Sequence, residues 1–152
     1  MSQGLETDRP VVRVAVGIVI EADADGWSVL ITRRRDGAVL GGFWELPGGK
    51  IRPDETPAQC VARELMEEVA LVVEPVRALS TVAHDYDHAR VVLHPWVCAR
   101  RGGEVEHREV AEHRWVRPEL LSSYAFPPAN EQIMTEIDRL FRSGNPLGCQ
   151  ET

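Results

Sequence analysis

The spacing of apolar and polar residues along the chain changes between the period of strands and the period of helices. Residues 11–22, VVRVAVGIVIEA, are rich in β-branched side chains, which predicts a strand buried on both faces. The turn-like DADG leads into residues 27–34, WSVLITRR, which predict a second strand and a hairpin. Further strands are predicted near residues 71–83, 90–100 and 113–116.

Two segments show the helical spacing of apolar residues. The first helix is predicted to start near Thr56 or Pro57, because threonine caps helices and proline is favourable in a first helical turn. A final helix is predicted from about Asn130 to Phe141, and the glycine-containing stretch 36–42 predicts a loop. The apolar stripe of the first helix consists of Ala58, Val61, Ala62, Leu65 and Val69.

Length and composition fit one soluble globular domain. The chain has 152 residues, of which 43% are hydrophobic and 27% are charged, and both fractions are ordinary for such a domain. We expect a flexible N-terminal segment at residues 1–10, a single domain at 11–142 and a flexible C-terminal tail at 143–152.

Charge and apolar content exclude several classes of function. The net charge of −7 argues against binding to a nucleic acid polymer, which requires a basic surface. The longest strongly apolar run, Val14–Ile20, is too short to span a membrane. The first residues, MSQGLETDRP, lack the basic and apolar regions of a secretory signal. Together with cysteines that form no motif, this predicts a cytoplasmic protein. The cysteines are Cys60, Cys98 and Cys149.

The stretch RELMEEVAL, residues 63–71, concentrates negative charge on the first predicted helix. Glu64, Glu67 and Glu68 are spaced i, i+3 and i+4, so they share one helix face and repel each other. The Glu64/Glu68 pair alone costs about 0.2–0.5 kcal/mol. A bound divalent cation removes this repulsion, and Mg²⁺ prefers carboxylate oxygens and bridges to substrate phosphates. The cluster therefore predicts a metal site that polarises a phosphoryl oxygen and activates water.

The residues around this cluster have a fixed spacing. Gly49 is followed after five residues by Glu55, and after seven more by RELMEEVAL. This pattern resembles the Nudix box, G-x5-E-x7-R-E-U-x-E-E-x-G-U, in which U is aliphatic. Only Ala70 departs from it, where the family has glycine, and a left-handed alanine costs about 1 kcal/mol. The resemblance implies an α/β fold of the Nudix type, an α/β/α sandwich in which helices flank a mixed sheet.

The resemblance also implies roles for the residues of the box. Arg63 either pairs with Glu67 one turn later or orients a neighbouring glutamate, which is the role that the family favours. Glu55 is either a supporting carboxylate behind the metal ligands or a loop residue. Gly49 permits a tight backbone path beside the metal. With Mg²⁺, or Mn²⁺ in its place, the residues implied to contact the metal are Gly48, Glu64, Glu67 and Glu68.

Three segments, ITRRR, FWELPGGKI and FPPANEQI, resemble the MutT branch of the family, and the resemblance runs from about Val12 to Asn130. MutT proteins hydrolyse oxidised guanine nucleotides, chiefly 8-oxo-dGTP, to the monophosphate and pyrophosphate. The resemblance implies that Asn130 reads the base, and an amide does offer a donor and an acceptor to a purine edge. Asn130 after two prolines is also a good helix cap, and both roles are compatible.

Two further charged residues complete the site that the resemblance implies. Arg34 corresponds to an arginine that contacts the nucleotide, although Arg33 and Arg35 are equally able to meet phosphate on charge alone. Glu109, in HREVAE, matches an extra glutamate that binds a further metal or acts as general base. Otherwise Glu109 is a surface residue of a polar loop. The neighbouring glutamates that could be confused with it are Glu106 and Glu112.

The surface that stacks on the base is expected to differ from that of MutT proteins. Leu46 occupies the position at which an aromatic residue is common in the branch, and it remains a predicted substrate contact. Tyr86 is an aromatic residue that could take over the stacking. Trp44 and Phe43 are alternatives, and all three aromatic residues could instead belong to the core.

These observations predict a Mg²⁺-dependent enzyme that uses water to split a nucleoside triphosphate into monophosphate and pyrophosphate, with 8-oxo-dGTP as substrate. One alternative is a Nudix hydrolase of pyrimidine triphosphates such as CTP or dCTP, because ARVVLHPW, residues 89–96, also resembles strands of that branch. Another is a non-catalytic nucleotide sensor, against which the intact glutamates argue. Zinc is not expected, since His107 and His113 lack partners at a suitable spacing.

Overall fold

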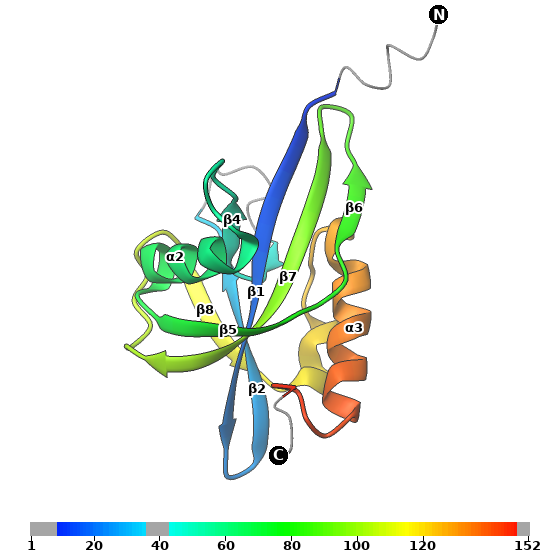
Figure 1. The fold of residues 1–152 in the computed structure, drawn as a ribbon. Coiled ribbons are helices and arrows are strands. Elements are labelled where there is room, and N and C mark those ends of the chain that lie inside the picture. Colours follow the sequence, from blue (N-terminus) through cyan, green and yellow to red (C-terminus); the bar gives the residue numbers. More distant parts are fainter. Residues whose placement is uncertain (1–8, 36–42, 149–152) are drawn as a thin grey trace, which may run out of the picture.

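The computed structural model describes residues 9–35 and 43–148, and Figure 1 shows a sheet with a helix on each side. The strands are β1 (Val11–Asp23), β2 (Gly26–Arg33), β3 (Trp44–Glu45), β4 (Gly48–Lys50), β5 (Val72–Ala78), β6 (Val82–Asp85), β7 (Arg90–Gly102) and β8 (Glu112–Val116). They form one sheet in the order β3-β2-β1-β7-β5, in which β4 pairs with β1, β6 with β7 and β8 with β2.

The central strands β1 and β7 run parallel, whereas the other strand pairs are antiparallel, so the sheet is mixed. Side chains of β1 point alternately into two cores. Ala15 and Val19 belong to one core, and Val16, Ile18 and Ile20 belong to the other. Burial on both faces explains why this strand reads as a continuous apolar run in the sequence.

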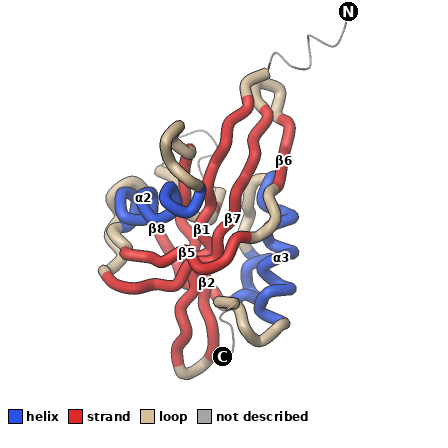
Figure 2. Tube along the Cα trace, in the orientation of Figure 1, coloured by secondary structure: helices blue, strands red, loops and turns tan. Residues whose placement is uncertain are grey.

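One helix covers each core, and the two helices lie on opposite faces of the sheet (Figures 1 and 2). The helices are α2 (Pro57–Val69) and α3 (Glu131–Arg142), and the short 3₁₀ turns η1 (Pro118–Ser123) and η2 (Pro128–Asn130) precede α3. The predicted α/β/α sandwich is therefore confirmed. The residues that the helices bury against the sheet include Val61, Leu65 and Val69 of α2 and Ile133, Ile137 and Leu140 of α3.

The structure divides the strand predicted at residues 71–83 into β5 and β6. Pro75 lies within β5, and the pairing of β5 with β7 shifts register between Pro75 and Arg77. Proline has no backbone N–H to donate, so it interrupts a ladder of hydrogen bonds. The chain then leaves the sheet at residues 79–81 before β6 begins. The prediction of one continuous strand is therefore wrong.

The other elements agree with their predicted positions to within a few residues. The strands predicted at 27–34, 90–100 and 113–116 are β2, β7 and β8, and both predicted helices are present. The segment before α2 is more regular than its prolines and glycines indicate, because it contains the short strands β3 and β4. These two strands place the residues between them next to β1 and β2, where the candidate site lies.

Contacts at both ends extend beyond the predicted domain. Arg9 and Pro10 form hydrogen bonds with the β6–β7 hairpin, and Leu147 packs against the core that α3 covers. The expected flexibility of residues 1–10 and 143–152 stays a prediction. Within the described ranges, no helix has both the length and the apolar character needed to cross a membrane. The parts of the predictions that lie outside the described residues are 1–8, the loop 36–42, and 149–152 with Cys149.

Candidate active site

The start of α2 is fixed by hydrogen bonds that determine where its glutamates lie. The Thr56 hydroxyl accepts a hydrogen bond from the Gln59 backbone N–H at 3.1 Å, and the Gln59 side chain accepts one from the Thr56 N–H at 2.9 Å. This reciprocal capping box confirms the predicted helix start. Because Leu65 is buried against the sheet, Glu64 lies beside β4, with its carboxylate close to Gly49.

Three carboxylates converge at this end of the molecule. Glu64, Glu68 and Glu109 each place one carboxylate oxygen within 4.8 Å of the others. The loop that carries Glu109 is attached to α2, because the Glu109 N–H donates to the Glu68 carbonyl oxygen at 3.2 Å. The cluster therefore joins two glutamates from one helical turn with a third from a distant loop. Convergent carboxylate oxygens are the ligand type that hard divalent cations prefer.

The electrostatics of Glu68 show how strongly these carboxylates interact. The pKa of Glu68 is raised to about 9. Burial is the largest cause, followed by a hydrogen bond to Glu64 and by the negative charges of Glu64, Glu45 and Glu109. Without a cation, the folded protein therefore favours a protonated carboxyl at this position. A divalent cation in the cluster favours the ionised form instead. The residues present thus fit a cation of this type.

Glu67 lies outside the group of three converging carboxylates. Its carboxylate accepts a hydrogen bond from Arg63 at 3.2 Å and lies 3.8 Å from the Arg52 guanidinium. The Glu67 side chain is 41% exposed, compared with 14% for Glu64. Its assignment as a metal ligand stays a prediction.

Arg63 connects the glutamates of α2 to the loop before the helix. Its Nε donates to Glu55 at 2.5 Å and its Nη1 donates to Glu64 at 3.0 Å. Both predicted arrangements of Arg63 are therefore present, since it contacts Glu67 as well as its neighbour Glu64. The hydrogen bond from Arg63 also lowers the pKa of Glu55 to about 2. Glu55 is thus an ionised anchor for Arg63 rather than an isolated loop residue.

The glycine pair of β4 is required by close approaches on both sides. A Cβ atom at Gly48 would lie 2.0 Å from the Ala15 carbonyl oxygen, and one at Gly49 would lie 2.4 Å from the Glu64 carboxylate. At Gly48 a larger side chain would have to move the backbone of β1, whereas at Gly49 it would displace the Glu64 carboxylate. The two glycines therefore bring main chain, with its carbonyl groups, directly beside the acidic cluster.

Ala70 ends α2 in the conformation that a glycine usually takes. Its φ and ψ angles are 63° and 27°, in the left-handed region. The Ala70 N–H closes the helix on the carbonyl oxygens of Leu65 and Met66. The departure from the box pattern therefore changes the side chain without changing the turn.

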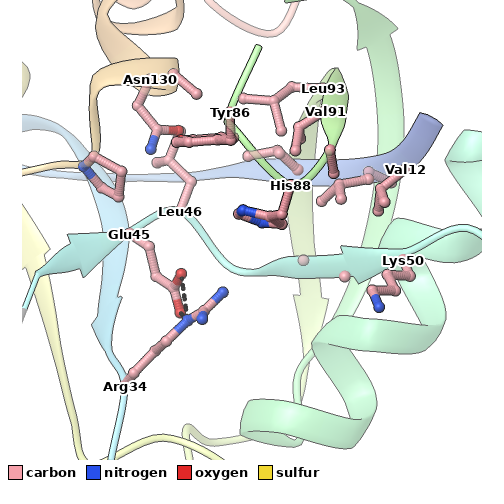
Figure 3. A pocket seen from close by; sticks show the side chains of 18 residues that line it. Val12, Arg34, Glu45, Leu46, Lys50, Tyr86, His88, Val91, Leu93 and Asn130 are labelled. Atoms are coloured by element: carbon pink, nitrogen blue, oxygen red, sulfur yellow. Dashed lines mark hydrogen bonds and ion pairs between the residues drawn. The ribbon is translucent and has the colours of Figure 1, made fainter. Parts of the chain in front are cut away.

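A cavity of about 540 Å³ opens beside β4 (Figure 3). Its wall is mainly apolar and includes Val91 and Leu93 of β7, and the strands β1, β3 and β4 supply other parts. Gly49 lines the cavity and also contacts the carboxylate of Glu64, so the cavity adjoins the acidic cluster. The predicted site residues among its lining are Arg34, Leu46, Gly48, Gly49, Tyr86 and Asn130.

Asn130 lines the cavity and does not cap α3 with its side chain. It is 9% exposed, and its amide makes no capping hydrogen bond to the first turn of the helix. The backbone of Asn130 already has helical angles, φ −88° and ψ −5°, because η2 leads directly into α3. A capping side chain requires an extended backbone at this position. The capping prediction is therefore wrong, whereas the position at the cavity agrees with a base contact.

The three arginines of ITRRR have different surroundings. Arg34 lines the cavity, and its Nε lies 3.0 Å from both carboxylate oxygens of Glu45 (Figure 3). Arg33 is paired with Glu112 across β2 and β8, at 2.5 Å. Arg35 donates to the Arg108 carbonyl oxygen at 2.5 Å. The structure therefore favours Arg34 as the arginine that faces a ligand in the cavity.

The candidates for base stacking also differ in whether they line the cavity. Leu46 is buried and belongs to the core that also forms the cavity floor. Tyr86 lines the cavity, with its ring stacked at 5.8 Å on that of His88. Trp44 and Phe43 are absent from the cavity lining. Tyr86 is therefore the aromatic candidate that is placed to meet a base.

The glutamates that neighbour Glu109 in sequence point to other partners. Glu112 accepts hydrogen bonds from Arg33, and Glu106 accepts one from Arg108 at 3.1 Å. The histidines of this region, His107 and His113, share a hydrogen bond of 2.8 Å. Glu109 is thus the glutamate of this loop that reaches the acidic cluster.

Three polar residues of the cavity were not predicted from the sequence: Glu45, Lys50 and His88. Glu45 and Lys50 stand within FWELPGGKI, on either side of the glycine pair. Their alternation with apolar residues in this stretch is the available signal, but it carries no fixed spacing. His88 lies in a turn, and its sequence neighbours give no indication of a ligand site.

Known proteins are similar to this chain over most of its length. The family profile described as the NUDIX domain matches residues 15–136. The chain is 33% identical over 128 residues to the 8-oxo-dGTP diphosphatase of Escherichia coli (strain K12), and the match covers 84% of this chain and 97% of that protein. It is also 28% identical over 131 residues to the CTP pyrophosphohydrolase of the same strain, over 86% of this chain and 94% of that protein.

A solved structure shows the same architecture. The MutT protein from Methanosarcina mazei Go1 superimposes with a TM-score of 0.75 and 25% sequence identity. The superposition covers 87% of this chain and 96% of the other. The similarity therefore extends over most of both chains.

Proposed function

Because this chain belongs to the Nudix hydrolase family, we propose that it hydrolyses 8-oxo-dGTP to the monophosphate and pyrophosphate. The observation that carries the proposal is the junction of the cavity with the acidic cluster at Gly49. A nucleotide whose base enters the cavity brings its phosphates to the carboxylates. The identity to the Escherichia coli 8-oxo-dGTP diphosphatase, over 97% of that protein, supports this substrate.

The acidic cluster is the proposed site of a divalent cation. Glu64, Glu68 and Glu109 would hold Mg²⁺, or Mn²⁺ in its place, and Glu67 and the Gly48 carbonyl are further proposed ligands. The cation supplies Lewis acidity, which polarises a phosphoryl oxygen and lowers the pKa of the attacking water.

The protein residues then position the reactants and move one proton. Glu109 is the proposed general base, because it reaches the cluster from its own loop and is not fixed by Arg63. Arg63 and Glu55 hold the Glu64 carboxylate in place. Water adds to phosphorus, the leaving pyrophosphate takes the electrons of the broken P–O bond, and Glu109 accepts the proton of the water.

Asn130 is the proposed reader of the oxidised base. In 8-oxoguanine, N7 carries a hydrogen, whereas N7 of guanine is an acceptor. The amide of Asn130 can accept a hydrogen bond from N7–H and donate one to O6, and it lines the cavity. Guanine offers two acceptors at the same edge and leaves the amide oxygen unpaired. An unpaired buried polar group is what discriminates strongly against the wrong substrate.

A pyrimidine triphosphate such as CTP or dCTP is the second candidate substrate, on the basis of the 28% identity to the CTP pyrophosphohydrolase. The identity to the 8-oxo-dGTP diphosphatase is higher, at 33%. The clustered carboxylates argue against a sensor that binds nucleotides without turnover. They repel each other unless a cation is bound, and this arrangement fits a metal-dependent hydrolase better. The net charge of −7 favours a small nucleotide over a nucleic acid polymer.

Pyrophosphate release from a panel of triphosphates tests the proposal. The panel contains 8-oxo-dGTP, dGTP, CTP and dCTP, each with Mg²⁺ or with a chelator. We expect release only with Mg²⁺, and the highest kcat/KM for 8-oxo-dGTP. A higher kcat/KM for CTP or dCTP identifies the second candidate, and binding without release identifies a sensor. The proposed role for this activity is removal of oxidised nucleotides from the cytoplasmic pool before they enter DNA.

A further inference from the structure

Glu45 is a cavity residue to which the proposed reaction gives no role. It ends β3, which pairs with β2 so that Glu45 lies opposite Thr32. Arg34 follows β2 directly, and the short antiparallel pairing therefore brings Arg34 and Glu45 together. The Arg34 Nε lies 3.0 Å from each carboxylate oxygen of Glu45.

The pair lies where the cavity meets the acidic cluster. Both residues line the cavity, and Figure 3 shows the Glu45 carboxylate directed at the Arg34 guanidinium. Glu45 lines the same cavity as Gly49, which lies against the Glu64 carboxylate of the cluster. A nucleotide with its base in the cavity and its terminal phosphates at the acidic cluster would place the phosphate next to the sugar beside Arg34 and Glu45.

The carboxylate of Glu45 is unexpected at this position, because its negative charge repels a polyphosphate. The Glu45 side chain is 25% exposed, and burial raises its pKa in spite of the nearby Arg34. Partial burial therefore disfavours the ionised form of Glu45, and its negative charge repels the phosphates of a bound nucleotide. Glu45 nevertheless forms an ion pair with the guanidinium of Arg34, whose side chain is 42% exposed.

We propose that Glu45 is a positioning residue, which holds the Arg34 guanidinium at the border of the cavity so that it contacts the substrate phosphate. This inference rests on the proposed function, since it requires a nucleoside triphosphate in the cavity. Loss of this ion pair leaves the Arg34 guanidinium less ordered, and ordering it again on binding lowers affinity. Glu45 acts through Arg34 and takes no part in proton transfer.

A double-mutant cycle tests the inference, with Glu45→Ala, Arg34→Ala and the double variant. KM and kcat are measured for the triphosphate that the wild type hydrolyses best, and Kd is measured for its non-hydrolysable analogue. We expect Arg34→Ala and Glu45→Ala each to raise KM and Kd by about 10-fold, because a hydrogen bond to a charged group is lost or displaced. We expect kcat to change by less than about 3-fold.

The cycle separates positioning from a direct role. Glu45→Ala should raise KM in the wild-type background. In the Arg34→Ala background it should leave KM unchanged or lower it, because only the repulsion between Glu45 and the phosphates is lost. An equal rise in both backgrounds overturns the inference, and so does a Glu45→Ala variant with unchanged KM and Kd. Glu45→Gln keeps an acceptor for Arg34 and should lie between Glu45→Ala and the wild type. Thermal unfolding of every variant identifies a change that comes from misfolding.

The matched control is Glu74→Ala, which removes the exposed ion pair of Glu74 with Arg101 between β5 and β7. We expect KM and Kd to equal those of the wild type. The Kd arm keeps the test independent of turnover. If the wild type binds the analogue without releasing pyrophosphate, the proposed function fails, whereas the Kd ratios still decide the role of Glu45. If the wild type does not bind any triphosphate, both proposals are contradicted.

Discussion

The acidic cluster and the cavity adjoin at Gly49, but they are built in different ways. The cluster takes Glu64 and Glu68 from a single turn of α2 and adds Glu109 from one loop that is attached to that helix. The cavity takes its polar residues from segments as far apart as Arg34 and Asn130. A rigid helix thus carries the reactive charges, whereas the shape of the whole sheet forms the binding space.

The two regions also differ in charge. In the cluster, burial and the closeness of the carboxylates raise the pKa of Glu68. The cavity is mainly apolar, and its charged pair Arg34 and Glu45 compensate each other. With the proposed function, this difference corresponds to a proposed division of tasks, in which the cluster carries out the hydrolysis and the cavity selects the base. A substitution in one region should therefore leave the property of the other region unchanged.

The largest effect is expected from the cluster. Glu68→Gln should preserve the fold and lower kcat by at least ~10²-fold, because an amide lacks the charge that a hard cation prefers. Steady-state pyrophosphate release, with circular dichroism as the check on folding, measures this. Glu119→Gln, at an exposed position of η1, is the control and should be as active as the wild type. Near-normal turnover of a folded Glu68→Gln protein contradicts the assignment.

The next effect is expected from the cavity. Asn130→Ala should reduce the preference for 8-oxo-dGTP over dGTP by about 30-fold, the contribution of one bidentate base contact, and should keep the Mg²⁺ requirement. Asn130→Asp loses the amide donor and should also lower the preference. Because Asn130 makes no capping hydrogen bond, both variants should unfold close to the wild-type temperature. An unchanged preference with a large loss of stability indicates a structural residue instead.

A pH effect should follow from the raised pKa of Glu68. Between its ordinary value of 4.5 and about 9, the folded metal-free protein keeps a proton that the unfolded chain releases. The stability of the metal-free protein should therefore fall as pH rises through this window, by the linkage of proton binding to folding. Mg²⁺ must displace the same proton, so its apparent affinity should rise with pH, by up to about 10-fold per unit.

Thermal unfolding with and without Mg²⁺ between pH 6 and 9 measures both trends. The increase in Tm on adding Mg²⁺ should grow with pH in the wild type. Glu68→Gln has no proton to lose at this position, so its response to Mg²⁺ should depend less on pH. A Mg²⁺ effect that is constant across this range contradicts the account of Glu68.

The smallest effect is expected at the end of α2, which belongs to neither region. Ala70 has a left-handed backbone, so Ala70→Gly should raise the free energy of unfolding by about 1 kcal/mol. Urea unfolding monitored by circular dichroism measures it, and kcat should not change. A loss of stability would mean that the freedom gained by glycine in the unfolded chain outweighs the strain of Ala70.

The same division explains how much of the site could be predicted from the sequence. The cluster was predictable because Glu64 and Glu68 follow from helical spacing and from the box pattern. Glu109 required the family resemblance, since nothing in its own neighbourhood distinguishes it from Glu106. The central strand and both helices were predictable from periodicity, whereas the break at Pro75 was missed because its neighbours favour a strand.

The cavity was predictable only in part, since its residues meet through tertiary pairing. Glu45 reaches Arg34 because β2 and β3 pair, and β3 has only two residues, too few to show a period. Asn130 lines the cavity, which is compatible with its predicted base contact, but its predicted role as a cap was wrong. The sequence does not show that η2 gives Asn130 helical backbone angles, which an N-cap residue does not have.

The measurement that tests the division of tasks most directly is the ratio of kcat/KM for 8-oxo-dGTP to that for dGTP in Glu68→Gln. The account predicts that kcat/KM falls for both nucleotides by the same factor of at least ~10², so that the ratio equals that of the wild type. The cavity would then select the base without help from the cluster. A ratio that falls toward one in Glu68→Gln, with the fold intact, would show that the cluster takes part in choosing the base and would contradict the account.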